Sequence, residues 1–593
     1  MEVYMMQEND IVFLNLHRRY INTVTNYGGF LGIYALAAFL NANGYTAQSF
    51  DGQLIEGKKL LDEICSRKQA AMIGLYCDYE NVTENIFLSK YIKDTYNIPV
   101  IVGGPQATAL DKEFFQKSCC DAVVRYEGEL TVLELLSFFL DGSGSLDNIK
   151  GIIYLKNNEL VINPEREIIE NLDLLPLIDD DCYLTGNKKS NELSIMTGRG
   201  CPFHCAFCHE GHHTRKVRFR SVQNVLDEIE IFLNKRHNTD NIFILFTDDT
   251  FTLLPQRVKE LCSGLKLLQQ KKPFNWFCEG HIHTLFLHPE MIDCIAEAGA
   301  QRIQLGIEAG TQEVLDAYRK GSTLEEIEFV VTKCRDAGIQ QIFSNIILGG
   351  ALFTSEVYEK NLAYAKKLIE LGQGSVEIAV VCYWPLPETS ITNCPEKYGI
   401  KILDKEFITA VGDFPQTETE HLNRWDILQM MQNMDAEIEK FMCRQLAENK
   451  IPEHKILSWF PKNNVIKSVG RWWNCLVNMP NLLNYYQMIY SGEAFSGKNM
   501  VLYGNEYMEL HPMRTISLYR YAKILDSENV EIFGCELNKT EQEILIYSTG
   551  KLSINEICLS VKEHNIGIDD ITDNIQSVFK KLEAYHLIVY SKY

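Results

Sequence analysis

The chain has 593 residues, 46% of them apolar and 23% charged, and this length predicts three or four domains. Its formal net charge of −22 argues against a non-specific nucleic-acid binder, so we expect no nucleic-acid partner. No window has the apolar length of a membrane span, and residues 1–20 lack the basic and apolar regions of a signal peptide. We therefore expect a cytoplasmic protein without a membrane partner, whose 18 cysteines are mostly reduced thiols.

Strand and helix patterns alternate through residues 1–150. Helical spacing runs over 31–40 and stops at Asn43-Gly44, and a second apolar helix is expected at 130–140. Short apolar runs predict buried strands at 11–16, 71–75, 100–102 and 121–124. This alternation predicts a doubly wound α/β domain that binds its ligand at the carboxyl ends of the strands.

The remainder divides into four further segments. Residues 151–190 predict a β-hairpin and a connector, and residues 396–527 predict a helical region. Residues 528–593 predict a small winged-helix-like module. Between them, residues 191–395 repeat the strand–helix alternation and predict a partial TIM-like (β/α)6 barrel with its site at the strand carboxyl ends. Its six strands are expected at 193–196, 241–247, 275–278, 302–307, 341–348 and 375–381.

Three cysteines follow the first predicted barrel strand at short spacing. They are Cys201, Cys205 and Cys208, within the run Gly-Arg-Gly-Cys-Pro-Phe-His-Cys-Ala-Phe-Cys. Three thiolates on one loop can ligate three irons of a [4Fe–4S] cluster, which leaves the fourth iron open to a substrate or cofactor.

Two other metal sites compete with this interpretation. A structural zinc site needs four ligands, and a histidine from 204, 209, 212 or 213 would have to supply the fourth. A ferredoxin-type cluster would need a fourth cysteine, for which no suitable spacing is present.

The cysteine run, with Phe207 before its last member, resembles the signature of the radical S-adenosylmethionine (SAM) superfamily. The segment with Asp248 and Asp249 resembles the DD-x-F element of cobalamin-linked members. Leu305–Gly310 resembles LGIESG and carries Glu308, and the segment around Pro385 resembles the P-x-P-G-T element. The resemblance implies that these residues bind SAM.

The order of domains resembles the cobalamin-binding class B enzymes of that superfamily. Gly103, Gly104 and Pro105 match its GGP loop, and the sequence Tyr-Glu127-Gly128-Glu resembles its GEGE element. The resemblance implies that these five residues bind cobalamin. No DxHxxG stretch supplies an axial histidine, and a domain that has lost cobalamin remains the alternative.

Residues 528–593 resemble a PqqD-like peptide-recognition element, with a pattern that begins Leu-Asn-Lys-Thr at 537–540 and ends Ala-Tyr-His-Leu-Ile at 584–588. The resemblance implies that a precursor peptide binds as an added strand. A structural cap and a nucleic-acid-binding winged helix are the alternatives.

Together the resemblances imply an enzyme with a [4Fe–4S] cluster, SAM and cobalamin, reduced by a protein such as flavodoxin or ferredoxin. It would methylate an unactivated carbon of a ribosomally made peptide through a 5′-deoxyadenosyl radical and methylcobalamin. Radical peptide modification without methyl transfer, class B chemistry on a small molecule, and a non-catalytic metal-binding protein stay open. The sequence identifies no catalytic acid, base or hydrogen donor.

Overall fold

The computed structural model describes residues 8–17, 31–184, 191–210, 216–236, 241–404, 414–460, 470–498, 505–564 and 571–592. The chain forms two compact units, residues 1–436 and residues 437–593. The first unit contains two large, mainly parallel sheets, and the second contains helices and short antiparallel strands. Each unit is described by itself below.

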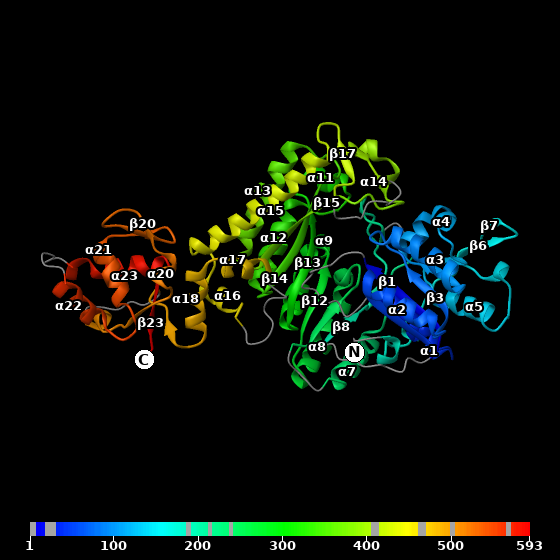
Figure 1. The fold of residues 1–593 in the computed structure, drawn as a ribbon, viewed down its shortest axis with the longest axis horizontal. Helices are drawn as coiled ribbons and strands as arrows, with labels where there is room; N and C mark the ends of the chain where they lie inside the picture. The colour runs from blue at the N-terminus through cyan, green and yellow to red at the C-terminus, as the bar shows by residue number, and fades with distance from the viewer. Residues whose placement is uncertain are drawn as a thin grey trace. The chain divides into compact units, whose positions relative to one another are not determined.

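The first sheet of unit 1 has seven strands in the order β2-β1-β3-β4-β5-β6-β7 (Figure 1). The parallel strands are β1 (Asn9–His17), β2 (Ala47–Gln53), β3 (Ala70–Tyr76), β4 (Val100–Gly103) and β5 (Ala122–Val124). One apolar layer packs α1 (Leu31–Ala42) and α5 (Glu129–Phe139) on the sheet. The other layer packs α2 (Leu54–Ser66), α3 (Val82–Tyr96) and α4 (Pro105–Lys117). This doubly wound arrangement confirms the predicted fold class.

Two features of this sheet differ from the sequence expectation. The strand β2 was missed because its run Ala-Gln-Ser-Phe-Asp-Gly-Gln lacks a continuous apolar pattern. The hairpin expected as a linker, β6 (Ile152–Lys156) and β7 (Glu159–Ile162), instead continues the sheet antiparallel to β5. Ile152 and Ile153 are fully buried, so both faces of this strand contribute to the core.

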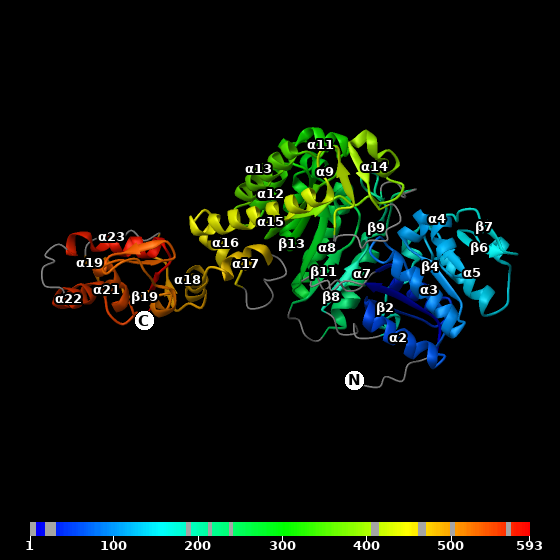
Figure 2. The ribbon, with the colours of Figure 1, turned by 45° about the horizontal axis from the view of Figure 1, so that its top comes forward.

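The second sheet of unit 1 forms an open half-barrel in the order β15-β14-β13-β12-β11-β8 (Figure 2). All six expected strands are present and parallel. They are β8 (Glu192–Ile195), β11 (Phe243–Phe246), β12 (Asn275–Gly280), β13 (Ala300–Glu308), β14 (Gln341–Leu348) and β15 (Val376–Cys382). Its helices are α7 (Val222–Asn234), α8 (Pro255–Lys271), α9 (Ile282–Leu287), α10 (Glu290–Glu297), α11 (Gln312–Ala317), α12 (Leu324–Asp336) and α13 (Ser355–Gly372).

The two faces of the half-barrel sheet differ in exposure. On β13, the alternate residues Ile303, Leu305 and Ile307 are at most 1% exposed. Arg302 and Gln304, which point to the opposite face, remain partly accessible. The concave face is therefore a hollow with polar groups rather than a filled core, and we call it the lumen.

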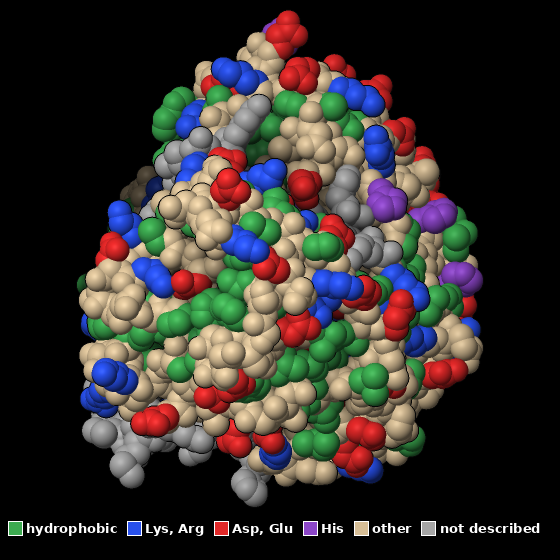
Figure 3. Space-filling view, turned by 90° about the vertical axis from the view of Figure 1, so that its right-hand side faces the viewer, with side chains coloured by type: hydrophobic (Ala, Val, Ile, Leu, Met, Phe, Trp, Pro, Cys, Tyr) green, Lys and Arg blue, Asp and Glu red, His purple; other side chains and the backbone are tan. Residues whose placement is uncertain are grey.

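Unit 1 continues after the half-barrel with α14 (Ser390–Asn393), the hairpin β16 (Ile400–Ile402) and β17 (Thr417–Thr419), and the first half of α15 (Arg424–Ala447). No helix among the described residues is both long and apolar enough to cross a lipid bilayer. Acidic and basic side chains are interspersed on the face shown in Figure 3.

Unit 2 contains the larger part of segment 396–527, for which helices were expected, and the whole of segment 528–593. Its helices are α16 (Glu453–Leu457), α17 (Gly470–Val477), α18 (Pro480–Tyr490), α19 (Asn505–Met508), α20 (Leu518–Tyr521), α21 (Lys539–Tyr547), α22 (Ile554–His564) and α23 (Ile571–Ala584). One sheet has the order β18 (Ala494–Phe495), β23 (Ile588–Ser591) and β19 (Pro512–Arg514). The other has the order β20 (Lys523–Ile524), β21 (Val530–Ile532) and β22 (Cys535–Leu537).

Candidate active site

The three predicted cluster ligands lie on one loop at the carboxyl end of β8. This loop, residues 200–210, is called the cluster loop. Cys205 is buried, and Cys201 and Cys208 are partly exposed. The Ala206 N–H donates to the carbonyl of Tyr318 at 2.8 Å, and the Ala206 carbonyl accepts from the Ile391 N–H at 3.1 Å. The end of α11 and the helix α14 (Ser390–Asn393) therefore fix the middle of the cluster loop.

The three cysteines supply the donor set expected for a cluster. Across the described residues, no three His, Cys, Asp or Glu side chains converge on one point that would suit a single metal ion. Three thiolates on one loop, each for a different iron, are the donor set of a [4Fe–4S] cluster with one open iron. His212 and His213 lie outside the described residues.

Asp248 and Asp249, which follow β11, hold the entry to the cluster loop. Asp248 is 4% exposed, and its carboxylate accepts hydrogen bonds from the N–H and hydroxyl of Thr197, both at 2.5 Å, and from the Gly198 N–H at 3.0 Å. Burial raises the pKa of Asp248 to about 6 against the effect of these donors. Asp249 accepts from the Gly200 N–H at 3.1 Å. Their expected contacts with SAM stay a prediction, since these bonds engage Asp248 with the protein.

Glu308 lies at the end of β13 in a left-handed conformation, with φ +64°. Its carboxylate forms a 3.0 Å ion pair with Lys320, and both side chains are about nine-tenths buried. A Cβ at Gly306 would lie 2.3 Å from the Lys320 Nζ, so this glycine of the LGIEAG segment makes room for the pair. Burial raises the pKa of the Cys205 thiol, and the Lys320 ammonium opposes that effect. Lys320 is thus a cation beside the cluster loop that sequence reasoning missed.

Aromatic side chains surround the cluster loop. The Phe207 and Tyr318 rings meet edge to face, with centroids 5.0 Å apart. The Lys320 ammonium lies over the face of the Phe207 ring. Phe203 stacks on the His281 imidazole with ring centroids 3.7 Å apart. Burial lowers the pKa of His281 to about 3, so this ring is neutral. Pro385 is buried in the loop after β15, and the same loop contacts His209 through the carbonyl of Pro387 at 3.3 Å.

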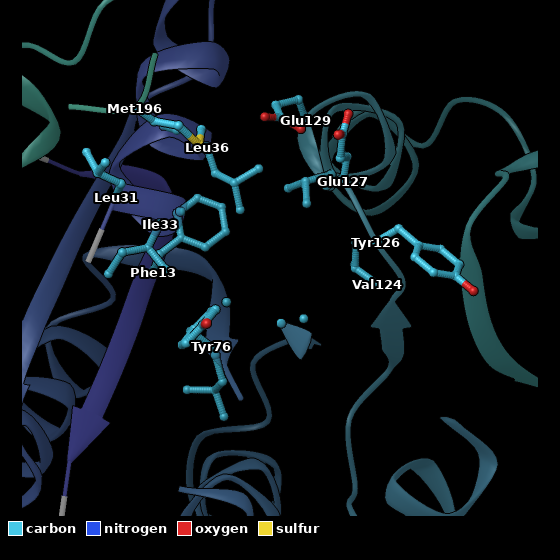
Figure 4. A pocket seen from close by; sticks show the side chains of 18 of the residues that line it. Phe13, Leu31, Ile33, Leu36, Tyr76, Val124, Tyr126, Glu127, Glu129 and Met196 are labelled. Atoms are coloured by element: carbon cyan, nitrogen blue, oxygen red, sulfur yellow. The ribbon is translucent and has the colours of Figure 1, made fainter. Parts of the chain in front are cut away.

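A cavity of about 730 Å³ lies at the carboxyl ends of the N-terminal strands, between that domain and the half-barrel (Figure 4). Its volume is in the range of cofactor pockets. Apolar side chains form much of its wall: Phe13, Leu31, Ile33, Leu36, Val124, Val132 and Met196. Its polar wall comes from both domains: Asp51, Glu127, Glu129, Arg199, Thr247 and Asp249. The N-terminal sheet therefore supplies one wall of the cavity, and the half-barrel supplies the wall opposite.

The GGP loop borders this cavity. Gly103 and Gly104 line it, and Pro105 begins α4. Gly104 has φ +110°, and a Cβ there would lie 2.5 Å from the carbonyl oxygen of Cys77. Only glycine fits this turn, because the backbone of the β3 loop occupies the space of a side chain.

The Tyr-Glu-Gly-Glu element also lines the cavity. Tyr126 has φ +62°, which explains why glycine suits this position in the family pattern. The Tyr126 ring points to the β6–β7 side, where its hydroxyl donates to Glu165 at 2.9 Å (Figure 4). Tyr126 therefore does not fill the cavity, and Gly128 adds little bulk to its wall. An apolar wall with glycine turns and a polar rim fits a large amphipathic cofactor such as cobalamin.

Glu127 and Glu129 pair with two arginines that sequence reasoning did not single out. Arg218 donates bidentately to Glu127, and Arg199 donates to Glu129 at 2.5 Å. Gly32, near the start of α1, also lines the cavity.

Two family models match parts of the chain. Residues 195–359 match the model described as the radical SAM superfamily, and residues 18–136 match the B12 binding domain. The chain therefore carries a B12-binding domain followed by a radical SAM domain. Its cofactors are a [4Fe–4S] cluster, SAM and cobalamin.

Curated relatives share parts of this sequence. An uncharacterized methyltransferase of Pyrococcus horikoshii, PH0819, is 30% identical over 294 residues, which are 49% of this chain and 60% of the relative. The cobalamin-dependent radical SAM methyltransferase TokK of Streptomyces tokunonensis is 27% identical over 59% of this chain and 52% of its own. The chain spans about half the length of the curated relatives it matches.

Solved structures share the fold. The cobalamin-dependent SAM radical enzyme OxsB, bound to aqua-cobalamin and SAM, superposes with a TM-score of 0.58 at 17% identity, covering 82% of this chain and 75% of OxsB. The radical SAM methyltransferase TsrM of Kitasatospora setae, bound to cobalamin and a [4Fe–4S] cluster, gives a TM-score of 0.55 at 16% identity. That match covers 73% of this chain and 89% of TsrM.

Proposed function

We propose that this protein is a cobalamin-dependent radical SAM methyltransferase. The observation that carries the proposal is the cavity whose wall comes from both domains, with Arg199 directly before the cluster loop among its lining residues. When bound, the cluster and SAM supply a 5′-deoxyadenosyl radical, and cobalamin supplies the methyl group. A cofactor cavity that borders the loop of the cluster ligands supports the use of both in one reaction.

The chain's own residues then have distinct tasks. Cys201, Cys205 and Cys208 bind the cluster, and Lys320 balances negative charge beside it. The glycine turns and apolar wall bind the flat cofactor, while the half-barrel covers it and excludes water. Exclusion of water protects a radical from side reactions and holds the reacting groups in position. We expect flavodoxin or ferredoxin to donate the electrons.

Anaerobic reconstitution tests the proposal. The wild-type protein should bind one cobalamin and four irons per chain and should cleave SAM to 5′-deoxyadenosine under dithionite. Cys201→Ala should abolish this cleavage but retain cobalamin, because the cavity does not include that residue. A protein that holds the cluster but no cobalamin would contradict the methyltransferase and favour radical chemistry with a relic domain. Continued cleavage of SAM by Cys201→Ala would contradict the cluster assignment.

We further propose a ribosomally made peptide as the substrate. In unit 2, three antiparallel strands precede three helices over residues 523–584, and β20 lies at an edge of its sheet. Ile524 on this edge is 79% exposed, and Phe533 beside the sheet is 37% exposed. An exposed strand edge with apolar side chains supports binding of a peptide as an added strand.

A small-molecule substrate is the second candidate. A relative from Streptomyces wedmorensis, 25% identical over 308 residues, is named cytidylyl-2-hydroxyethylphosphonate methyltransferase.

The test is fluorescence anisotropy with labelled peptides encoded beside the gene. A PqqD-like module predicts micromolar binding, weakened at least tenfold by Ile524→Pro, since proline removes a backbone donor and restricts the edge strand. The control is Ile546→Ala, which removes an exposed apolar side chain from helix α21 of the same module and leaves the edge strand intact. Alanine is used there because proline would break the helix. Absence of binding by any neighbouring peptide would favour the small molecule.

A further inference from the structure

Four charged side chains meet where the B12-binding domain contacts the cluster loop. Arg199 and Arg218 lie opposite each other on the short antiparallel pair β9 (Gly198–Arg199) and β10 (Arg218–Phe219). Glu127 and Glu129 lie at the N-terminus of α5 in the B12-binding domain. The strand β9 precedes the cluster loop and β10 follows it. The two glutamates therefore contact the chain both before and after the three cysteines.

The ion pairs cross from one domain to the other in a fixed pattern. The Arg218 guanidinium donates to both oxygens of Glu127 and also to the carbonyl of Ile169 at 2.6 Å. Arg199 donates to Glu129 at 2.5 Å and lies 3.4 Å from the nearer oxygen of Glu127. Glu127 thus faces both arginines. Burial alone would raise the pKa of its carboxyl, but the arginines outweigh burial, and the pKa lies below its usual value.

These charges are withdrawn from water. The side chains of Arg218, Arg199 and Glu129 are 7%, 14% and 5% exposed. A buried ion pair adds little stability over an apolar contact of equal volume, because removing the charges from water costs about as much as their attraction returns. Its particular property is geometry, since a bidentate arginine–carboxylate pair fixes both distance and angle. These ion pairs are therefore better suited to fixing the relative position of the two domains than to adding stability.

The position concerned is that of the cluster relative to cobalamin. Glu127, Glu129 and Arg199 line the cavity, while Arg218 does not. From the half-barrel side, Asp248 and Asp249 hold the same entry segment through the N–H groups of residues 197, 198 and 200. The cluster loop is thus fixed by carboxylates of both domains.

We propose that Glu127, Glu129, Arg199 and Arg218 form an interdomain clamp that sets the distance between the cluster and the cobalamin cavity. The proposal rests on the proposed function, because a fixed separation matters only if both cofactors act on one substrate. The four are positioning residues: they act through the loop that binds the cluster. A displacement of about 1 Å at a reacting centre can lower a rate by about 100-fold.

Arg218→Gln tests the clamp without replacing a residue of the cavity wall. A Gd(III) chelate on Cys119, in a Cys394→Ser background, marks the B12-binding domain, since these two are the exposed cysteines. Pulsed dipolar electron paramagnetic resonance then measures the distance from Cys119 to the reduced cluster. We expect the distribution of distances to at least double in width in Arg218→Gln, with cluster and cobalamin content unchanged. Arg218→Lys, which keeps the charge but loses the bidentate geometry, should fall between this variant and wild type.

Glu134→Gln is the matched control, because Glu134 lies on the same helix and pairs with Arg166 at 2.5 Å, away from the cluster loop. It should leave the distance distribution unchanged. A distribution in Arg218→Gln as narrow as in the control would overturn the clamp. Loss of folding in both Arg218 variants would assign these residues a structural role only and would equally overturn it. A wild-type protein without cobalamin would contradict the proposed function, whereas the label-to-cluster distance would still decide on the clamp.

Discussion

Glu279 shows how a single side chain acquires a property that its type does not predict. It lies on β12, faces the lumen, and accepts one hydrogen bond from the Gln304 amide at 3.2 Å. Burial raises its pKa to about 7, and the carboxylates of Asp249 and Glu308 add to this rise. Lys320 and Arg302 oppose it, but incompletely. The lumen therefore holds a carboxyl group that titrates near neutral pH and can donate or accept a proton.

This shift predicts a pH-dependent stability. A carboxyl whose pKa is raised in the folded state stabilises the fold below its unfolded pKa, and the effect is lost as the pH rises through the folded value. The wild type should therefore lose about 1.5 kcal/mol between pH 5.8 and pH 8 through this group. Glu279→Gln should remove that loss and unfold at a higher temperature than wild type at pH 8. Calorimetry of the cofactor-free protein at both pH values measures the difference.

The exposed Glu260→Gln on α8 is the control for this measurement. An equal effect of Glu279→Gln at both pH values would show that the carboxyl does not titrate in this range.

At the scale of elements, the turn between β4 and α4 carries the cofactor loop. The sequence identifies Gly103-Gly104-Pro105 as a functional loop, yet Gly104 is required first by the neighbouring backbone of Cys77. The conformation of this turn depends on the loop after β3, which is remote in sequence. The β4–α4 turn therefore packs on the loop after β3, and the ends of these two strands together form one edge of the cavity.

Gly104→Ala should destabilise the protein by about 3 kcal/mol, because it combines an unfavourable φ with a clash. Gly142→Ala is the matched control: Gly142 has φ +66°, but a Cβ there meets nothing within 4 Å. It should cost about 1 kcal/mol, from the backbone conformation alone. Thermal unfolding compares the two variants, and retained cobalamin measures the loss of the cavity edge. Equal costs would mean that the Cys77 loop moves away without penalty.

At the scale of the molecule, the two compact units should respond differently to the cofactor. The cavity is lined entirely by residues of unit 1. Ligand at 100 times its dissociation constant stabilises the binding fold by about 2.7 kcal/mol. That gain should appear only in unit 1.

Hydrogen exchange with and without cobalamin tests this. Amides of β3, β4 and the N-terminal turn of α5 should exchange more slowly with cobalamin, and those of α21–α23 should not change. Protection throughout residues 437–593 would show that both units respond to the cofactor.

The sequence by itself determined the parallel strands of both sheets except β2, and it indicated Cys201, Cys205 and Cys208 as the cluster ligands. Apolar runs of 4–8 residues and a three-cysteine spacing are local signals, so they need no tertiary information. Its resemblance to the class B enzymes also assigned Gly103, Gly104, Glu127 and Gly128 to one ligand, and the structure brings all four to the wall of one cavity.

Only the tertiary structure decided which partners these residues have. Lys320 joins Glu308, and Arg218 joins Glu127 across 91 positions of sequence, and neither pairing has a local pattern. The polar strand β2 and the placement of β6 and β7 in the sheet likewise depend on neighbours that are distant in sequence. The cavity exists because two domains meet, which no single segment encodes. Ion pairs and shared cavities are formed by chain folding, so the sequence indicates the cofactors but not the contacts that align them.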